Sequence, residues 1–374
     1  MKQIGLKSYR FSISWARIYP DDSGKINERG LAFYNNLINE LIKAGIQPLC
    51  TLYHWDLPMW LHEKGGWESE ESIDAFVQYA KTCVEAFSDR VRYWLTFNEP
   101  SCFIGAGYES GAHAPFMRLS EDSLDKLTRN VMLAHGKAVM AMREVAKQPL
   151  QIGAAPATPI HTPIDESAEQ IEIARQKNFD VSQRGTISWW ADPVILGKRQ
   201  VGTNYLSDED LKIIAQPLDF FGFNIYNADG YDAPPQKANP RAYAGHPRTT
   251  MDWVITPDCL YWATRFLYER YGLPIMVTEN GMANVDFVML DGKVHDPQRI
   301  DYVQRHLLYL KRAIEEGVPV IGYQYWSVMD NFEWSLGYSR RFGLIYVDYQ
   351  TQERTLKDSA YFYAEIIKTN GKNL

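Results

Sequence analysis

The chain has few cysteines and no pattern that would use them. Four occur in its 374 residues, without a CxxC pair or the spacing of metal ligands, and we expect ordinary reduced thiols. No run of about 18 apolar residues is present, so no membrane-spanning helix is predicted. The first residues show no secretory apolar region, which favours a cytoplasmic location.

The chain also lacks positive charge, cofactor motifs and linkers. With 39 basic against 46 acidic residues its net charge is −7, which disfavours nucleic acid or an anionic membrane as a partner. No HExxH, phosphate-binding loop or Cys/His cluster is present, so we predict neither a metal nor a cofactor. No Pro/Ser/Gly-rich stretch divides the sequence, and we expect one catalytic domain over residues 1–374.

What the chain does have is a regular alternation of short β-branched or aromatic runs with longer segments of helical period. Repeated strand-then-helix order predicts an α/β fold with a parallel sheet. The expected strands are 8–14, 47–53, 93–97, 151–155, 220–225, 274–278 and 320–326. The expected helices are 31–44, 73–87, 123–143, 258–271, 299–316 and 359–368.

Polar side chains recur where these strands end. They are Arg10, His54, Asn98, Glu99, Asn224, Tyr226, Glu279 and Trp326. In a doubly wound sheet such residues would gather near one switch point, whereas in a closed barrel strand ends from the whole ring meet at one mouth. The barrel fits better. We therefore predict a (β/α)8 TIM-type barrel, incomplete because seven strands are readable and such a barrel has eight.

Two glutamates carry the chemistry that the sequence suggests. Glu99 lies in the run Thr-Phe-Asn-Glu-Pro and Glu279 in Thr-Glu-Asn-Gly, each at the end of an expected strand. Two carboxylates across a small gap are what cleavage of a glycosidic bond requires. Either glutamate alone is as readily explained as a helix cap or an ion-pair partner. Both together favour a sugar-cleaving enzyme.

Seven runs together resemble the retaining β-glycosidases of glycoside hydrolase family 1, the β-glucosidase type. They are residues 9–17, 53–58, 96–100, 223–226, 278–281, 326–334 and 341–348. Each lies at or near a strand end, and the resemblance covers nearly the whole chain. It implies hydrolysis of terminal β-D-glucosides, with galactosides and fucosides as further candidates, through a covalent glycosyl-enzyme intermediate.

The resemblance assigns Glu99 as acid/base and Glu279 as nucleophile. A retaining pair lies about 5–5.5 Å apart. Arg10 is expected to stabilise the ionised Glu279, whose charge in turn raises the pKa of Glu99. Tyr226 is expected to donate a hydrogen bond to Glu279, and Asn98 to contact the sugar 2-OH.

The resemblance also implies a set of substrate-binding residues: His54, Trp55, Asn98, Asn224, Trp326, Glu333, Trp334 and Phe342. Trp326 would form the floor on which the sugar stacks. Glu333 would accept hydrogen bonds from free 4-OH and 6-OH groups and repel a 6-phosphate, which disfavours phosphoglycosides. Taken alone, His54 is as readily a structural histidine and Asn224 a turn-former.

The sequence departs from the family at its beginning. Family members usually start with a strand and helix bearing a Gln-Ile-Glu-Gly-Ala run, whose glutamine holds the sugar, and the chain has no such run. Its absence would leave apolar strand edges at 8–14 and 320–326, which proteins rarely expose. We expect a homo-oligomer to cover the missing unit. Two alternatives are a non-catalytic glycan-binding protein and an inactive barrel fragment.

Overall fold

The computed structural model describes residues 1–157, 160–180, 185–199, 204–229 and 245–374. Its chain divides into two compact units. The first unit comprises Met1–Lys7, Thr158–Asn178 and Phe223–Leu374, and the second comprises Ser8–Ala157 and Phe179–Gly222. Each is described below by itself.

The second unit alternates strands and helices from its first residue. Its strands are β1 (Ser8–Ser12), β2 (Gln47–Tyr53), β3 (Tyr93–Asn98), β4 (Gln151–Ala155) and β6 (Phe220–Asn224), whose last residues belong to the first unit. Its helices are α1 (Trp15–Ile18), α2 (Glu28–Lys43), α3 (Met59–Glu63), α4 (Glu71–Phe87), α5 (Pro100–Ile104), α6 (Glu121–Val145), α8 (Ile187–Ala191) and α9 (Asp208–Ile214), with the short turns η1 (Gly66–Glu68), η2 (Gly105–Glu109) and η3 (Asp192–Leu196).

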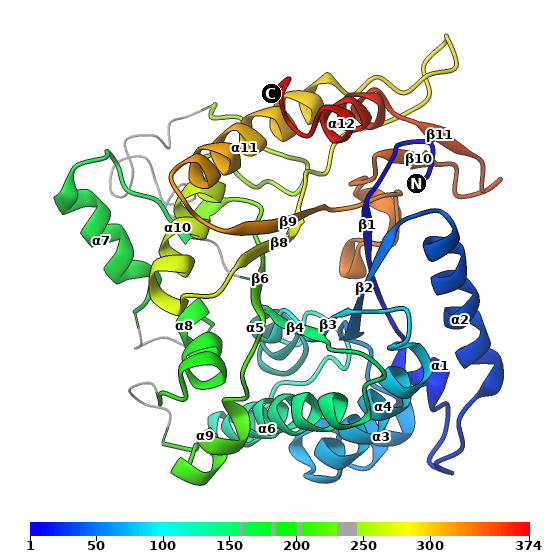
Figure 1. Ribbon diagram of the computed structural model, residues 1–374, viewed down its shortest axis with the longest axis vertical. Coiled ribbons are helices and arrows are strands. Elements are labelled where there is room, and N and C mark those ends of the chain that lie inside the picture. The colour runs from blue at the N-terminus through cyan, green and yellow to red at the C-terminus, as the bar shows by residue number, and fades with distance from the viewer. Residues whose placement is uncertain (158–159, 181–184, 200–203, 230–244) are drawn as a thin grey trace. The chain divides into compact units, whose positions relative to one another are not determined.

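The first unit holds the remaining elements. Its strands are β5 (Ile160–His161), β7 (Ala228–Asp229), β8 (Ile275–Asn280), β9 (Val320–Tyr325), β10 (Ile345–Val347) and β11 (Arg354–Leu356). Its helices are α7 (Ala168–Asn178), α10 (Cys259–Tyr271), α11 (Pro297–Glu315) and α12 (Asp358–Thr369), with the turn η4 (Trp334–Ser339). Helix α11 packs against both α10 and α12, and the three helices are seen together in Figure 1.

The main sheet has the strand order β1-β2-β3-β4-β6-β8-β9. Its pairs are parallel, with Arg10 opposite Leu49 and Tyr53 opposite Phe97. Six of the seven residues of β2 are buried, which is the pattern of a parallel strand covered on both faces. Because parallel strands run in one direction, the residues at their carboxyl ends come to the same edge of the sheet.

All seven expected strands are present: 47–53 and 151–155 have the predicted bounds, and the other five differ by one or two residues at one or both ends. The strand expected over 8–14 stops at Ser12, since Ser14 already precedes helix α1. The strand expected over 274–278 runs on to Asn280, so Glu279 lies within β8 rather than after it. The predicted seven parallel strands with intervening helices are thus confirmed. The predicted single domain stays a prediction.

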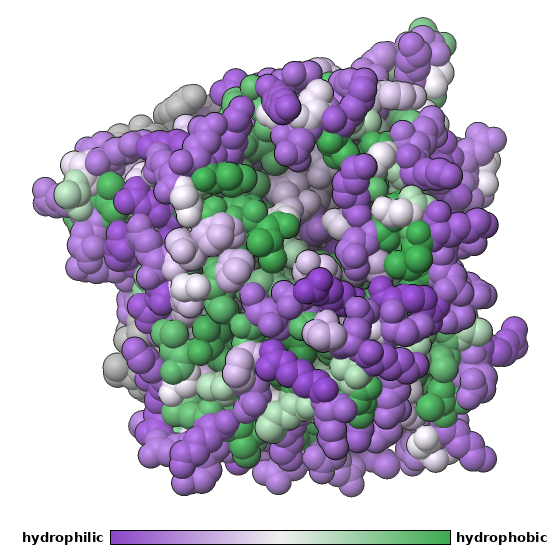
Figure 2. All heavy atoms as spheres, in the orientation of Figure 1, coloured by the Kyte–Doolittle hydropathy of each residue, from purple (hydrophilic) through white to green (hydrophobic). Residues whose placement is uncertain are grey.

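Hydrophilic side chains cover most of the face drawn in Figure 2, with apolar ones between them. One apolar stretch follows β8, where Val285, Phe287 and Leu290 are exposed. Strand β9 is also poorly covered: only its last residue is buried, and Ile321 is 48% exposed. Among the described residues, no helix is both long and apolar enough to cross a membrane.

The core of the second unit is aromatic, and one of its hydroxyl groups joins two strand ends. Trp15 and Tyr79 stack with ring centroids 5.3 Å apart. The Tyr79 hydroxyl lies 2.8 Å from the carbonyl oxygens of both Ile13 and Leu52. The single hydrogen of this buried hydroxyl is therefore shared between two main-chain acceptors, one from each of two neighbouring segments.

We expect Tyr79→Phe to destabilise the protein by about 1–3 kcal/mol, because the substitution removes the hydroxyl that donates to these buried carbonyl groups. Urea unfolding would measure the loss. Tyr309→Phe, at a partly exposed position on α11, is the matched control and should change the free energy of unfolding little. Equal effects of the two substitutions would contradict the assignment.

Candidate active site

Glu279 is held at the carboxyl end of β8 by the residues that follow β6. The Ile225 amide donates to the Glu279 carbonyl oxygen at 3.0 Å, and the Asn280 side chain donates to the Ile225 carbonyl at 2.8 Å. The Tyr226 hydroxyl donates to Glu279 Oε2 at 2.6 Å. Main chain and carboxylate are thus fixed from one short segment, and the side chain is only 4% exposed.

Neighbouring side chains hold this arrangement in turn. The Tyr302 hydroxyl donates to the Tyr226 carbonyl at 3.0 Å. Thr278 donates to Asn224 Oδ1 at 2.6 Å. Both Asn224 and Thr278 are buried, so this bond fixes the amide that the sequence analysis placed in the site. Tyr302 was not among the predicted site residues; it lies inside helix α11 and has no motif of its own.

Two aromatic rings lie against Tyr226. The Trp253 ring centroid is 5.0 Å away and that of Phe342 is 6.1 Å away. Phe342, a predicted substrate-binding residue, is 2% exposed. In this structure it therefore supports the Tyr226 ring rather than facing open space. Trp253 was missed because its sequence context resembles no motif.

Gly281 is required by a close approach of two backbones. A Cβ atom at this position would overlap the carbonyl oxygen of Trp326. The Trp326 amide also donates to the Asn280 carbonyl at 2.9 Å. The glycine of the Thr-Glu-Asn-Gly run thus lets Trp326 lie directly beside the end of the strand that bears Glu279.

Glu333 has an environment that disfavours its charge. Burial and the negative charge of Glu279 raise its pKa from the ordinary value of 4.5 to about 7, although a hydrogen bond with the Trp326 side chain opposes the rise. Its Oε2 atom has no hydrogen-bond partner among the described residues. A buried acceptor without a donor is a suitable partner for a ligand hydroxyl group.

In the second unit, Asn98 is the centre of the predicted site residues. Arg10 Nη2 donates to Asn98 Oδ1 at 2.6 Å, and Asn98 Nδ2 lies 3.1 Å from His54 Nε2. Trp55 Nε1 donates to the Asn98 carbonyl oxygen at 3.0 Å. Four of the predicted site residues, from β1, β3 and the segment after β2, are therefore brought together around Asn98.

His54 is neutral in this setting. Burial, with the nearby charge of Arg10, lowers its pKa to about 3. A neutral imidazole can accept at one nitrogen, so Nε2 accepts the Asn98 Nδ2–H and the proton resides on Nδ1. The contact with Arg10 supports this tautomer, because a guanidinium can only donate and therefore faces the Asn98 amide oxygen, which leaves Nδ2–H toward His54.

Glu99 follows β3 in a conformation that sequence reasoning did not foresee. Its backbone is left-handed, with φ of 47°, and its amide donates to the Ala155 carbonyl at 2.8 Å. The next residue, Pro100, begins α5, a position that suits proline. The side chain is 7% exposed. Glu99 and Arg10 belong to the second unit and Glu279 to the first, so their predicted proximity stays a prediction.

A pocket of about 340 Å³ lies beside the segment that carries Glu333. Phe332, Tyr338 and Tyr349 line it, whereas Glu279 and Tyr226 do not. It is therefore not the pocket of the carboxylate chemistry. Among the described residues, no group of three or more His, Cys, Asp or Glu side chains is arranged to hold a metal ion.

The sequence profile of glycosyl hydrolase family 1 matches residues 1–372. This chain belongs to that family. β-Glucosidase A of Acetivibrio thermocellus is 41% identical to it over 388 aligned positions, which cover 99% of this chain and 85% of the relative. β-Glucosidase A of Thermotoga maritima is 39% identical over 99% of this chain and 84% of the relative.

Solved structures of β-glucosidases have the same fold as this chain. The β-glucosidase from Thermotoga maritima in complex with deoxynojirimycin matches with a TM-score of 0.88 and 38% identity, over 99% of this chain and 85% of the other. Its complex with glucoimidazole matches with the same TM-score. The family-1 chain thus has the predicted (β/α)8-type fold and is a glycoside hydrolase of the β-glucosidase type.

We expect Tyr226→Phe to lower kcat about tenfold or more, because Glu279 loses a hydrogen bond to its charged form and the restraint on its angle. Steady-state kinetics with p-nitrophenyl β-D-glucoside would measure this. Tyr361→Phe, on the exposed face of α12, is the control. An unchanged kcat in Tyr226→Phe would show that the hydroxyl does not orient the carboxylate.

Glu333→Gln should stabilise the protein at alkaline pH. The folded-state pKa of about 7 exceeds the ordinary 4.5, so ionising Glu333 costs folding free energy. This cost is absent below pH 4.5, grows between the two values and is complete above pH 7. We expect a gain of about 1–3 kcal/mol at pH 8.

The gain should vanish at about pH 3, well below the ordinary pKa of 4.5, where Glu333 is protonated in both the folded and the unfolded state of the wild type. Urea unfolding of both proteins at the two pH values would measure it. An equal effect at both pH values would show that the charge of Glu333 is not its cause.

Proposed function

We propose that the protein hydrolyses terminal, non-reducing β-D-glucosides with retention of configuration, using Glu279 as nucleophile and Glu99 as acid/base. One observation carries most weight: Glu279 is buried at the end of β8 and oriented by Tyr226 at 2.6 Å. The family membership and the names of the relatives support the substrate class. We extend the proposal to β-galactosides and β-fucosides.

The reaction proceeds in two displacements. In the first, a Glu279 oxygen attacks the anomeric carbon while protonated Glu99 donates its proton to the departing glycosidic oxygen. This breaks the bond to the aglycone and forms a glycosyl ester on Glu279. In the second, ionised Glu99 takes a proton from water, whose oxygen attacks the same carbon and releases Glu279. Each displacement inverts the anomeric centre, so the product retains the β configuration.

The remaining residues hold the sugar in this proposal. Asn98 contacts the 2-OH, with its amide fixed by Arg10 and His54. Arg10 additionally stabilises the ionised nucleophile. Trp326 stacks beneath the ring.

Trp55, Asn224 and Trp334 complete the predicted set of binding residues, and Phe342 contributes through its contact with the Tyr226 ring. Glu333 accepts from the 4-OH and 6-OH groups, for which its unpartnered Oε2 is suited. A site that hydrogen-bonds these hydroxyls penalises substrates that lack them.

Replacing Glu279 by glycine should abolish hydrolysis of p-nitrophenyl β-D-glucoside, and added azide should restore release of nitrophenol. Azide then occupies the space of the lost carboxylate and attacks directly, so a single inversion gives the α-glucosyl azide. Nuclear magnetic resonance of the product would establish its configuration.

Glu99→Ala should lose roughly 10²–10⁴-fold in rate, the usual contribution of a general acid/base. With Glu279 intact, azide would intercept the covalent intermediate and give the β-glucosyl azide. The reverse product pattern would exchange the two roles. A wild-type protein that binds glucosides without cleaving them would favour a glycan-binding function instead.

We also propose one catalytic domain and a homo-oligomer. The poorly covered β9, with Ile321 exposed, supports pairing of this strand with another copy. The predicted cytoplasmic location stays a prediction.

Ile321→Lys should shift sedimentation toward the monomer, since a lysine on a strand edge opposes pairing. Ile314→Lys, at an exposed position on α11, should leave sedimentation unchanged. A wild type that sediments as an active monomer at every concentration would contradict the oligomer.

A further inference from the structure

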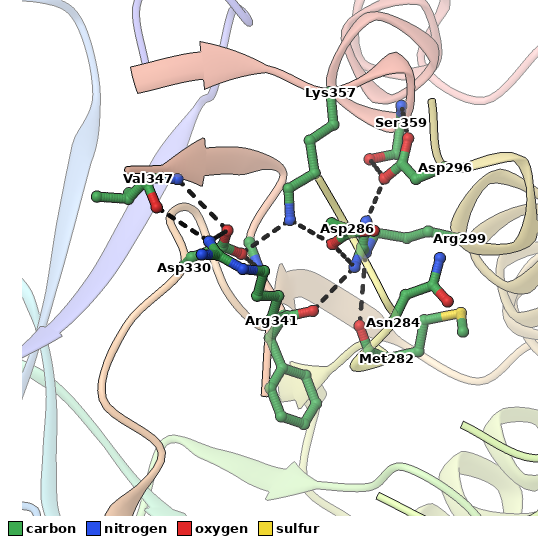
Figure 3. A network of polar contacts seen from close by, with 12 residues as sticks. Met282, Asn284, Asp286, Asp296, Arg299, Asp330, Arg341, Val347, Lys357 and Ser359 are labelled. Atoms are coloured by element: carbon green, nitrogen blue, oxygen red, sulfur yellow. Dashed lines mark hydrogen bonds and ion pairs between the residues drawn. The ribbon is translucent and has the colours of Figure 1, made fainter. Parts of the chain in front are cut away.

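A cluster of charged side chains is buried in the first unit (Figure 3). Its members are Asp286, Asp296, Arg299, Asp330, Arg341 and Lys357. All except Arg341 have side chains with no exposure to solvent, and Arg341 is 18% exposed. Three acids and three bases balance, which is the condition under which buried charges are tolerated.

Lys357 joins two segments that both lead away from the candidate active site. Its ammonium group donates to Asp286 Oδ2 at 2.6 Å and to Asp330 Oδ1 at 2.8 Å. Asp286 lies in the segment that follows β8 and Glu279. Asp330 lies in the segment that follows β9, three residues before Glu333. Lys357 directly follows β11, and its main chain also forms an isolated parallel bridge with Val294, in the segment that follows β8.

Asp330 receives donors from several directions. Arg341 Nη1 donates to its Oδ2 at 2.6 Å, and the amide of Gly343 donates to its Oδ1 at 3.0 Å. A Cβ atom at Gly343 would overlap the Asp330 amide nitrogen, so the backbones pack directly. This cluster therefore fixes the position of Asp330. It also fixes the beginning of the segment that leads from Asp330 to Glu333.

Asp286, the second acid that Lys357 contacts, is also held by several hydrogen bonds. Arg299 Nη2 donates to Asp286 Oδ2 at 2.6 Å and to the Arg341 carbonyl at 2.9 Å, and the Asn284 amide donates to the same carbonyl at 3.1 Å. Burial raises the pKa of Asp286, but the charges of Arg299 and Lys357 outweigh it and lower that pKa overall. Asp286 is thus ionised, and its bond with Lys357 is charge-assisted.

We propose that Lys357 is a positioning residue for sugar recognition: by joining Asp286 to Asp330, it holds the segment of Glu333 in register with the segment that follows Glu279. The inference rests on the proposed role of Glu333 at the sugar hydroxyl groups. Lys357 touches no substrate. Its contribution is to specificity, because a displaced Glu333 no longer meets the hydroxymethyl group while Glu279 and Tyr226 keep their own hydrogen bonds.

The test compares p-nitrophenyl β-D-glucoside with the β-D-xyloside, which lacks the hydroxymethyl group. Lys357→Met should lower the glucoside/xyloside ratio of kcat/KM roughly tenfold, the size of one hydrogen bond to a charged group, and leave kcat for the xyloside much less affected. Lys368→Met on the exposed face of α12, where Lys368 pairs with Glu365, is the matched control and should keep the wild-type ratio.

A second variant separates positioning from stability. Lys357→Met combined with Asp286→Asn removes one charge of each sign, so it should regain thermal stability relative to Lys357→Met. It still lacks the link, and the lowered ratio should persist. Recovery of both the stability and the ratio would overturn the proposal, because charge balance alone would then explain the effect.

Glu333→Gln distinguishes this inference from the proposed function. It should lower the same ratio directly. If Glu333→Gln leaves the ratio unchanged, the proposed sugar contact is wrong. If it lowers the ratio while both Lys357 variants keep the wild-type value, the positioning role is wrong and the proposed function stands.

Discussion

The candidate site depends on the hydrogen bonds between the end of β8 and the residues that follow β6. Ile225 and Tyr226 fix the main chain and the carboxylate of Glu279 from one side. Gly281 lets the Trp326 backbone approach from the next strand. The Glu279 carboxylate is therefore oriented in the protein without a substrate, which is how a site avoids reorganisation during reaction.

Two kinds of buried charge serve this site in different ways. The cluster around Lys357 and Asp330 is balanced, so its charges hold segments together. Glu333 is unbalanced, since burial and Glu279 both oppose its ionisation. Proteins retain such destabilising groups where function requires them. In the proposed function, a sugar hydroxyl group would donate the hydrogen bond that Glu333 Oε2 lacks.

Much of the strand pattern could be predicted, because buried parallel strands produce continuous apolar runs. The predicted ends of the strands were less accurate than the predicted strands themselves. Glu99 was expected simply to follow its strand, yet its left-handed backbone depends on the bond to Ala155 from the neighbouring strand. Likewise Tyr302 and Trp253, which support Tyr226, gave no sequence signal, since a hydrogen bond and a ring contact bring together residues far apart in the chain.

The sequence by itself determined which side chains stand at the strand ends, since the period of apolar residues and the motifs around Glu99 and Glu279 are local properties. Only the tertiary structure decided which distant groups meet. Lys357 lies 71 residues from Asp286 and 27 from Asp330, and its role exists only where all three are buried together. Pairing of interior charges depends on how the whole chain packs, and no local pattern encodes it.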